Sequence, residues 1–330
     1  MKKLTVITAA AVLAASLAAC GRGGAENQTV TAAPNTTAPV TITESPDADT
    51  TRPADSSEPV PSPVTTGFKR GGRSLYGENT GTSATYTGLE PLPEIHLAAE
   101  GGSGLSTASA SHSFGVSKNG VPNEIAVNNQ KIYEKFGGYC LLEDGSKSIY
   151  LTFDCGYENG VTPAILDTLK EKNVPAAFFV TMPYIESAPE LVARMVNEGH
   201  TVGNHSDHHP DFACISREKM AAEIESVDNA LRSRFGYSSP YFRFPAGSYN
   251  ESALQLVQSV GYTSVFWSSA YADWDPNAQK GADYAFTTVT SRLHPGCVLL
   301  LHAVSSDNAA ALGDIIDFAR AQGYEFLPLP

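Results

Sequence analysis

Seven short apolar runs, rich in β-branched and aromatic residues, recur along the chain from residue 148 onward. They are Ser148–Phe153, Ala176–Thr181, Thr201–His205, Tyr241–Pro245, Thr263–Ser268, Cys297–His302 and Tyr324–Leu329. Runs of this length and composition are typical of β-strands. We therefore expect seven strands in this part of the chain.

Helix signals lie between the first and third runs. Thr162 followed by Pro163 predicts an N-cap with proline at the first helical position. Ser187 and Glu190 have the spacing of a capping box, and Gly199 is a suitable helix end. Two helices are expected here.

Two later segments carry apolar residues at helical spacing. Steps of three and four residues place five side chains on one face: Met220, Ile224, Val227, Leu231 and Phe235. A second set marks the last helix, which Gly323 ends: Leu312, Ile315, Ile316 and Ala319. We expect both faces to pack in the core.

Strands and helices therefore alternate along the chain. Such alternation predicts a parallel β/α architecture, and either an open doubly wound sheet or a barrel fits. Barrel enzymes carry their chemistry on the loops at the carboxyl ends of the strands. The positions of the polar residues test whether this chain does the same.

The first twenty residues form a targeting segment. Lys2 and Lys3 precede an uncharged apolar run, Leu4–Leu17, and small residues lead to Cys20. The run is short for a transmembrane helix, and the segment resembles a bacterial lipoprotein signal in which Cys20 is lipidated. An ordinary signal peptide or an uncleaved anchor are the alternatives, and all three predict an extracytoplasmic protein.

Residues 21–110 are rich in Thr, Ala, Pro, Ser and Gly, without a persistent helical or strand period. Such a stretch cannot bury enough apolar surface to offset its ordering entropy. We predict a largely disordered tether that lets a domain at residues 111–330 reach away from the membrane. The part near Leu89 to Leu97 is apolar enough to pack on that domain.

Charge and cysteine content limit the binding partners and the disulfides that this chain can form. The net charge of -13 comes without clusters of Lys and Arg, which excludes nucleic acid and indicates an acidic, solvated surface. Outside the cytoplasm the cysteines after Cys20 can pair, although the sequence sets no connectivity and buried thiols are the alternative. These are Cys140, Cys155, Cys214 and Cys297. A monomer is the default expectation.

Five of the seven expected strands deliver ionisable or metal-binding groups at their carboxyl ends. In chain order these groups are Asp154 with Cys155, His205 with His208 and His209, Arg243, Asp273 beside Trp274, and His302. The carboxyl ends of parallel strands meet at one end of a barrel. The sequence therefore predicts a single constructed site.

The two outer histidines of the second group suit a metal. His205 and His209 are four residues apart, a spacing that on a helical turn brings both imidazoles to one side, as a Zn²⁺ or similar ion requires. His208, between them, is expected to point elsewhere.

The remaining groups suit acid–base chemistry. Arg243 ends an apolar strand, where an unpaired guanidinium is costly, and pairing with Asp154 would keep that carboxylate ionised. Asp273 would fix the tautomer of His302 and raise its pKa. A base, an acid and a pair of metal-binding histidines are the groups that metal-assisted hydrolysis requires.

The motifs TFDCGYENG, HSDHHP, RFPAG, DW and LLLH, in this order, resemble those of the polysaccharide deacetylase family, also called carbohydrate esterase family four or the NodB-homology domain. The resemblance runs from about Ser113 to Pro330 and implies a distorted (β/α)₇ barrel. The flanking segments are similar to the delta-lactam-biosynthetic de-N-acetylases, which deacetylate N-acetylmuramic acid in peptidoglycan. These segments are Ser113–Asn123, Tyr150–Thr162 and Leu299–Leu312.

The resemblance implies four catalytic roles. Asp154 matches the catalytic base that activates water, and His302 matches the general acid that protonates the departing amine. Arg243 matches the partner of the base, and Asp273 matches the partner of the acid.

The resemblance also implies the binding residues. His205 and His209 match two ligands of a divalent metal, with Zn²⁺ favoured. Trp274 and Leu300 match the walls of the acetyl-methyl pocket, and the backbone N–H of Ala246 matches an oxyanion donor.

Cys155 departs from the family pattern, because most members have there a second Asp that is the third metal ligand. The muramic branch also tends to lack that Asp. Three interpretations of Cys155 stay open: a zinc-binding thiolate, a disulfide with Cys214, or a small residue facing the substrate.

Other functions also stay open. One alternative is an N-acetylglucosamine deacetylase of peptidoglycan or another surface polysaccharide. Another is a catalytically silent wall-binding lipoprotein. A serine esterase is disfavoured because the chain has no G-x-S-x-G motif.

Overall fold

The computed structural model describes residues 86–143 and 145–330. The expected signal segment, Cys20 and the expected tether up to residue 85 lie outside the described residues. In the described ranges, no helix has both the length and the apolar composition to cross a membrane.

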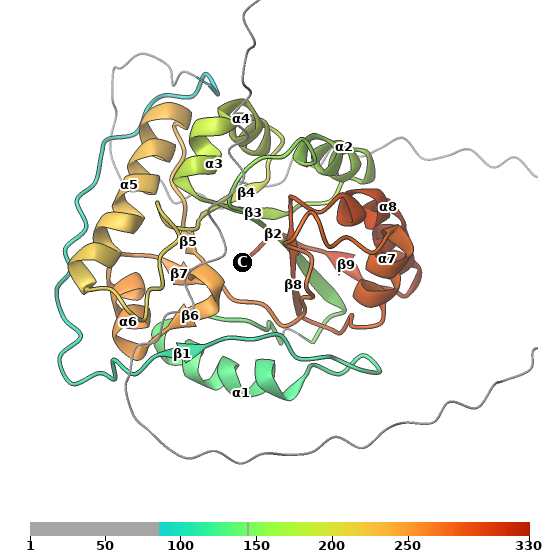
Figure 1. The fold of residues 1–330 in the computed structure, drawn as a ribbon, viewed down its shortest axis with the longest axis horizontal. Coiled ribbons are helices and arrows are strands. Elements are labelled where there is room, and N and C mark those ends of the chain that lie inside the picture. The colour runs from blue at the N-terminus through green and yellow to red at the C-terminus, as the bar shows by residue number, and fades with distance from the viewer. Residues whose placement is uncertain (1–85, 144) are drawn as a thin grey trace, which may run out of the picture. The chain divides into compact units, whose positions relative to one another are not determined.

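Seven parallel strands form the central sheet, in the order β7-β5-β4-β3-β2-β8 with β9 also paired to β2 (Figure 1). Their bounds are β2 (Ser148–Cys155), β3 (Ala177–Val180), β4 (Thr201–Asn204), β5 (Tyr241–Phe242), β7 (Thr263–Ser264), β8 (Cys297–His302) and β9 (Glu325–Phe326). Each strand lies in or overlaps one of the seven apolar runs, so the predicted strand set is confirmed.

The sheet curls until its two edges meet. Just after β7, the backbone N–H of Ser268 donates to Val298 O at 2.9 Å, and the N–H of Leu300 donates to Ser269 O at 2.9 Å. The chain beyond β7 thus pairs in parallel with β8. The result is a distorted barrel, which decides against the open doubly wound sheet.

Apolar side chains from the strands and their flanks fill the barrel interior. This cluster contains Tyr139, Tyr150, Ala177, Phe179, Tyr241, Val265, Val298 and Leu329. Leu329 comes from the C-terminal tail, whose end lies within the ring of strands in Figure 1.

Helices cover the outer face of the sheet (Figure 1). The α-helices are α1 (Glu124–Tyr133), α2 (Thr162–Lys172), α3 (Met182–Ser187), α4 (Pro189–Asn197), α5 (Arg217–Phe235), α6 (Glu251–Ser259), α7 (Ala282–Thr290) and α8 (Ser306–Ala321). Two 3₁₀ turns, η1 (Glu134–Phe136) and η2 (Pro245–Gly247), and a short antiparallel pair, β1 (Ala110–Ser111) with β6 (Ser248–Tyr249), complete the fold.

The two amphipathic faces expected from the sequence are buried, in α5 and α8. Gly199 and Gly323 directly follow the caps of α4 and α8 with positive φ, which glycine adopts without strain. The predicted ends of these helices are therefore confirmed.

Two expected helix caps are wrong. Ser187 ends α3, where its hydroxyl donates to Pro183 O at 2.7 Å, and α4 begins afresh at Pro189, so there is no capping box. Thr162 lies inside α2 and its hydroxyl donates to Glu158, which leaves Val161 as the N-cap. In both cases a nearby proline or acceptor outweighs the local capping signal.

Residues 86–110 run along α5 (Figure 1, cyan). The N–H of Ile95 donates to Asn229 Oδ1 at 2.8 Å, and the N–H of Leu97 donates to Glu225 Oε2 at 2.7 Å. The packing expected near Leu89 to Leu97 is therefore observed, because α5 supplies acceptors for an otherwise unpaired segment.

Candidate active site

Asp154, Arg243 and His205 form a contact cluster at the carboxyl ends of the strands. Arg243 Nη1 donates to Asp154 Oδ1 at 2.8 Å, and His205 Nε2 lies 3.5 Å from Asp154 Oδ2. Because β5 and β2 are not neighbours in the sheet, Arg243 reaches Asp154 across the barrel. The predicted pairing is confirmed.

The Arg243 side chain is completely buried, and its other donors are also used. Nη1 donates to Thr152 Oγ1 at 2.9 Å, Nε to Val265 O at 2.9 Å and Nη2 to Phe266 O at 3.2 Å. Its guanidinium carbon lies 4.1 Å from the centre of the Phe179 ring. These contacts offset the desolvation of the charge and fix the orientation of Arg243.

The charge on Arg243 governs Asp154. Burial alone would raise the pKa of the Asp154 carboxyl, but Arg243, with His205 and His302, lowers it below 3.8. Asp154 is therefore a carboxylate at neutral pH, as a general base requires.

His302 and Asp273 form the second pair. His302 Nδ1 lies 2.6 Å from Asp273 Oδ1, and the backbone N–H of His302 donates to Asp273 Oδ2 at 2.8 Å. Burial lowers the pKa of His302, but the Asp273 carboxylate outweighs it and the net pKa is raised above 6.5. The imidazole is thereby held by Nδ1, which leaves Nε2 to donate a proton.

Asn308, on the first turn of α8, was not anticipated. Its Nδ2 donates to Asp273 Oδ2 at 2.6 Å, and its Oδ1 accepts from the hydroxyl of Tyr271 at 2.5 Å. Asn308 lies four residues before Leu312, on the buried face of the helix. An amide on an otherwise apolar face was the available signal, because it needs a polar partner inside the protein.

The rings of His205 and His209 lie together, with centroids 4.9 Å apart, but not on a helical turn. They are joined by an irregular loop in which Ser206 and His209 have φ of 69° and 56°. The N–H of Ser206 donates to Asn204 Oδ1 at 2.9 Å, and the N–H of His209 donates to Ser206 Oγ at 3.0 Å. These side-chain acceptors stabilise a backbone conformation that non-glycine residues seldom adopt.

His208 points away from the pair, as expected. Its ring contacts Glu223 Oε1 at 3.2 Å, and its backbone N–H donates to Glu223 Oε2 at 2.7 Å.

The two rings fit part of a metal site. His205 Nδ1 contacts the carbonyl oxygen of Arg243 at 2.9 Å, so Nδ1 carries the proton and Nε2 has a free lone pair. Burial lowers the pKa of His205, which favours the neutral, ligand form. Within residues 86–143 and 145–330, no three His, Cys, Asp or Glu side chains gather as a complete metal site.

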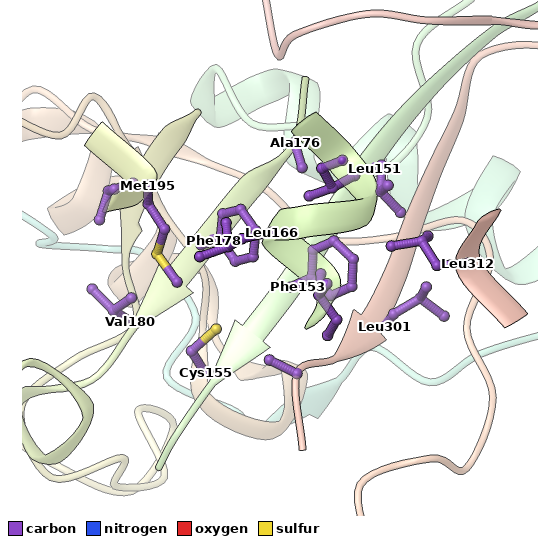
Figure 2. Packing of buried hydrophobic residues seen from close by; sticks show 14 of the residues in the cluster. Leu151, Phe153, Cys155, Leu166, Ala176, Phe178, Val180, Met195, Leu301 and Leu312 are labelled. Atoms are coloured by element: carbon purple, nitrogen blue, oxygen red, sulfur yellow. The ribbon is translucent and has the colours of Figure 1, made fainter. Parts of the chain in front are cut away.

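Cys155 does not join the histidines. Successive strand residues face opposite sides, so Asp154 faces the barrel interior while Cys155 packs among Phe153 and Val180 under the helices (Figure 2). Burial, with the charge on Asp154, raises the pKa of its thiol, the reverse of what a metal-bound thiolate needs. No disulfide joins it to Cys214. The three expectations for Cys155 are therefore not met.

The expected pocket residues are placed separately. Leu300 packs with Trp267 and Ala270, whereas Trp274 is exposed, with its ring centroid 5.9 Å from that of His302. Trp267 was not anticipated, although it lies in the fifth apolar run. Ala246 lies in η2 with φ 51°, a strained conformation for alanine in the turn that follows Arg243.

Comparison with known proteins places this chain in a family. The profile described as "Polysaccharide deacetylase" matches residues 142–265. An uncharacterized 30.6 kDa protein of Geobacillus stearothermophilus is 44% identical over 217 residues, which cover 66% of this chain and 82% of the relative. Peptidoglycan-N-acetylmuramic acid deacetylase PdaA of Bacillus subtilis is 42% identical over 214 residues, which cover 64% of this chain and 81% of PdaA.

The fold agrees with this similarity. The structure of Bacillus subtilis PdaA, described as a family 4 carbohydrate esterase, matches with a TM-score of 0.66 and 40% identity, covering 68% of this chain and 96% of PdaA. The order of the motifs, the two ion pairs at the carboxyl end of the barrel and the similarity to these relatives all support one family assignment. This chain belongs to the polysaccharide deacetylase family, carbohydrate esterase family four, whose members hydrolyse N-acetyl amide bonds and are generally metal-dependent.

Proposed function

We propose that this protein removes the acetyl group from N-acetylmuramic acid in peptidoglycan. The proposal rests on the opposite pKa shifts of two neighbouring groups at one end of the barrel. The pKa of Asp154 is lowered and the pKa of His302 is raised, which widens the pH range over which the ionised carboxylate and the protonated imidazole coexist. Groups tuned apart in this way suit the base and the acid of a hydrolysis.

Each residue then has one task. Asp154 accepts a proton from the attacking water, and Arg243 keeps Asp154 ionised and oriented. The backbone N–H of Ala246 donates to the carbonyl oxygen as negative charge develops on it. His302 gives a proton from Nε2 to the amine nitrogen as the C–N bond breaks, so the products are acetate and a free amino sugar.

The proposal includes a metal. His205 and His209 would hold a divalent ion, proposed to be Zn²⁺, whose chemistry there is Lewis-acid polarisation of the acetyl carbonyl.

Muramic acid is proposed because the Bacillus subtilis relative, 42% identical, is named for that sugar. The lipoprotein-like segment ending at Cys20 supports action on the outer side of the membrane, with the chain anchored by lipid.

Mass spectrometry of peptidoglycan digested after incubation with the purified protein tests the sugar. We expect loss of acetyl from muramic acid, abolished by a chelator and by Asp154→Asn. Loss from glucosamine would keep the family activity and refute the muramic assignment. No loss from either sugar, with metal supplied, would favour a silent wall-binding protein.

A further inference from the structure

Two exposed aromatic side chains adjoin the candidate active site and take no part in the proton transfers proposed above. Trp274 is 50% exposed and Phe114 is 38% exposed. The Phe114 and Trp274 ring centroids are 6.3 Å apart at an interplanar angle of 62°, and Trp274 stands at 67° to His302. The Trp274 ring therefore contacts both the His302 ring and the Phe114 ring.

Phe114 belongs to a segment fixed at both ends, residues 112–123, which we call the strap. At its start, His112 Nε2 lies 2.6 Å from Trp267 O, and the N–H of His112 donates to Gly247 O at 2.8 Å. At its end, Asn123 Nδ2 donates to Ser268 O at 2.8 Å. Both anchors hold the strap to the segment that leads on to Trp274.

The middle of the strap is also tightly placed. A Cβ at Gly115 would lie 2.2 Å from Asn123 Oδ1, so only glycine lets the strap pass this side chain. Phe114 is thus an exposed aromatic side chain on a held backbone. Exposing a large apolar ring on an ordered segment beside a catalytic group is typical of a binding surface.

We propose that Phe114 and Trp274 form a subsite that packs against the sugar unit next to the one being deacetylated. This inference rests on the proposed action on a glycan strand. A pyranose ring presents apolar C–H faces that pack on aromatic rings, and neither side chain carries a charge that would select an ion. Because Trp274 adjoins His302, a strand whose reacting sugar lies at His302 would place its next unit on Trp274 and Phe114.

Tryptophan fluorescence tests this proposal directly. The chain has two tryptophans, and only Trp274 is substantially exposed, since Trp267 is 7% exposed. Full-length protein with Asp154→Asn, which blocks turnover, would be titrated with peptide-free peptidoglycan tetrasaccharide and, separately, with a single N-acetylated amino sugar. We expect the tetrasaccharide to protect Trp274 from acrylamide quenching more than the single sugar does.

The second variant is Phe114→Ala in the same background. We expect its Kd for the tetrasaccharide to rise about five- to tenfold, with a smaller change for the single sugar. Val121→Ala, exposed on the same strap but in no ring contact with Trp274, is the matched control and should keep the parent Kd. Equal melting temperatures would show that folding is unaffected.

Two outcomes overturn the subsite. One is an unchanged tetrasaccharide Kd in Phe114→Ala, and the other is a loss of affinity seen only with peptide-bearing glycan, which would assign the surface to the stem peptide. Acetate release by the wild-type protein is measured separately. Activity without a Phe114 effect therefore refutes the subsite alone, whereas a Phe114 effect without activity refutes the proposed hydrolysis.

Discussion

At the scale of single residues, the neighbours of Asp154 and His302 set their protonation states. Burial favours the neutral form of both groups, and in each case one buried partner of opposite charge, Arg243 or Asp273, reverses that preference. Arg243 pairs with Asp154 across the barrel, as predicted from the cost of leaving a guanidinium unpaired at the end of an apolar strand. The position of Asn308 behind Asp273 was not predictable, because it depends on how α8 docks.

The pH dependence of kcat/KM follows from these shifts. Activity needs Asp154 ionised and His302 protonated, so we expect the profile to rise below pH 3.8 and to fall above pH 6.5. In Asp273→Asn, burial lowers the pKa of His302 without the opposing effect of the Asp273 carboxylate. We therefore expect the descending limb to move to lower pH. An unchanged descending limb in that variant would contradict the role of Asp273.

Asn308→Ala tests the residue behind the acid. Loss of the Asn308 Nδ2 hydrogen bond frees Asp273 to turn, so we expect kcat to fall about tenfold with KM little changed, as for a lost supporting interaction. Steady-state kinetics give both values. Asp314→Asn, on the exposed face of the same helix, should match the wild-type protein. A tenfold rise of KM with unchanged kcat would instead assign Asn308 a role in substrate binding.

Cys155→Ser separates a core residue from a metal ligand. We expect unchanged metal stoichiometry and a free energy of unfolding lower by about 1–3 kcal/mol, because a hydroxyl replaces a thiol in an apolar cluster. Metal analysis and denaturant unfolding measure the two effects. Cys155→Ala, which adds no hydroxyl, should also keep its metal. Metal loss in either folded variant would restore the ligand interpretation.

At the scale of elements, the apolar runs predicted all seven strands, because buried strands need continuous apolar side chains whatever the loops do. Local capping signals were weaker guides. The Ser187 signal failed because Pro189 starts α4, and the i, i+4 histidines are joined by a loop instead of a helical turn. Positive φ at Ser206 and His209 depends on side-chain acceptors that a pattern of residue types does not reveal.

The loop between β4 and α5 should control metal affinity through Ser206. Ser206→Ala removes the acceptor for the His209 N–H, so we expect metal affinity to fall about 10- to 100-fold, as for other groups that orient ligands. Metal titration measures the affinity. His208→Ala, in the same loop but directed at Glu223, is the control and should bind metal normally. Equal affinities in the Ser206 variant and the wild-type protein would show that the loop needs no such support.

At the scale of the whole domain, the interior of the barrel differs in composition from the carboxyl ends of its strands. An apolar cluster that includes Leu329 of the C-terminal tail packs the interior, whereas the carboxyl ends carry both ion pairs and both candidate ligands. The strap adds exposed aromatic surface beside that end. The residues at the strand ends were therefore the part of the sequence that indicated function.

Acetate release from purified peptidoglycan tests the central claim most directly, with wild-type protein compared with Asp154→Asn and His302→Gln at equal metal content. Base and acid contribute about 10²- to 10⁴-fold each. The account predicts acetate release by the wild-type protein and a loss of that size in each variant. No release by the metal-loaded wild-type protein, or activity retained in either variant, would contradict it.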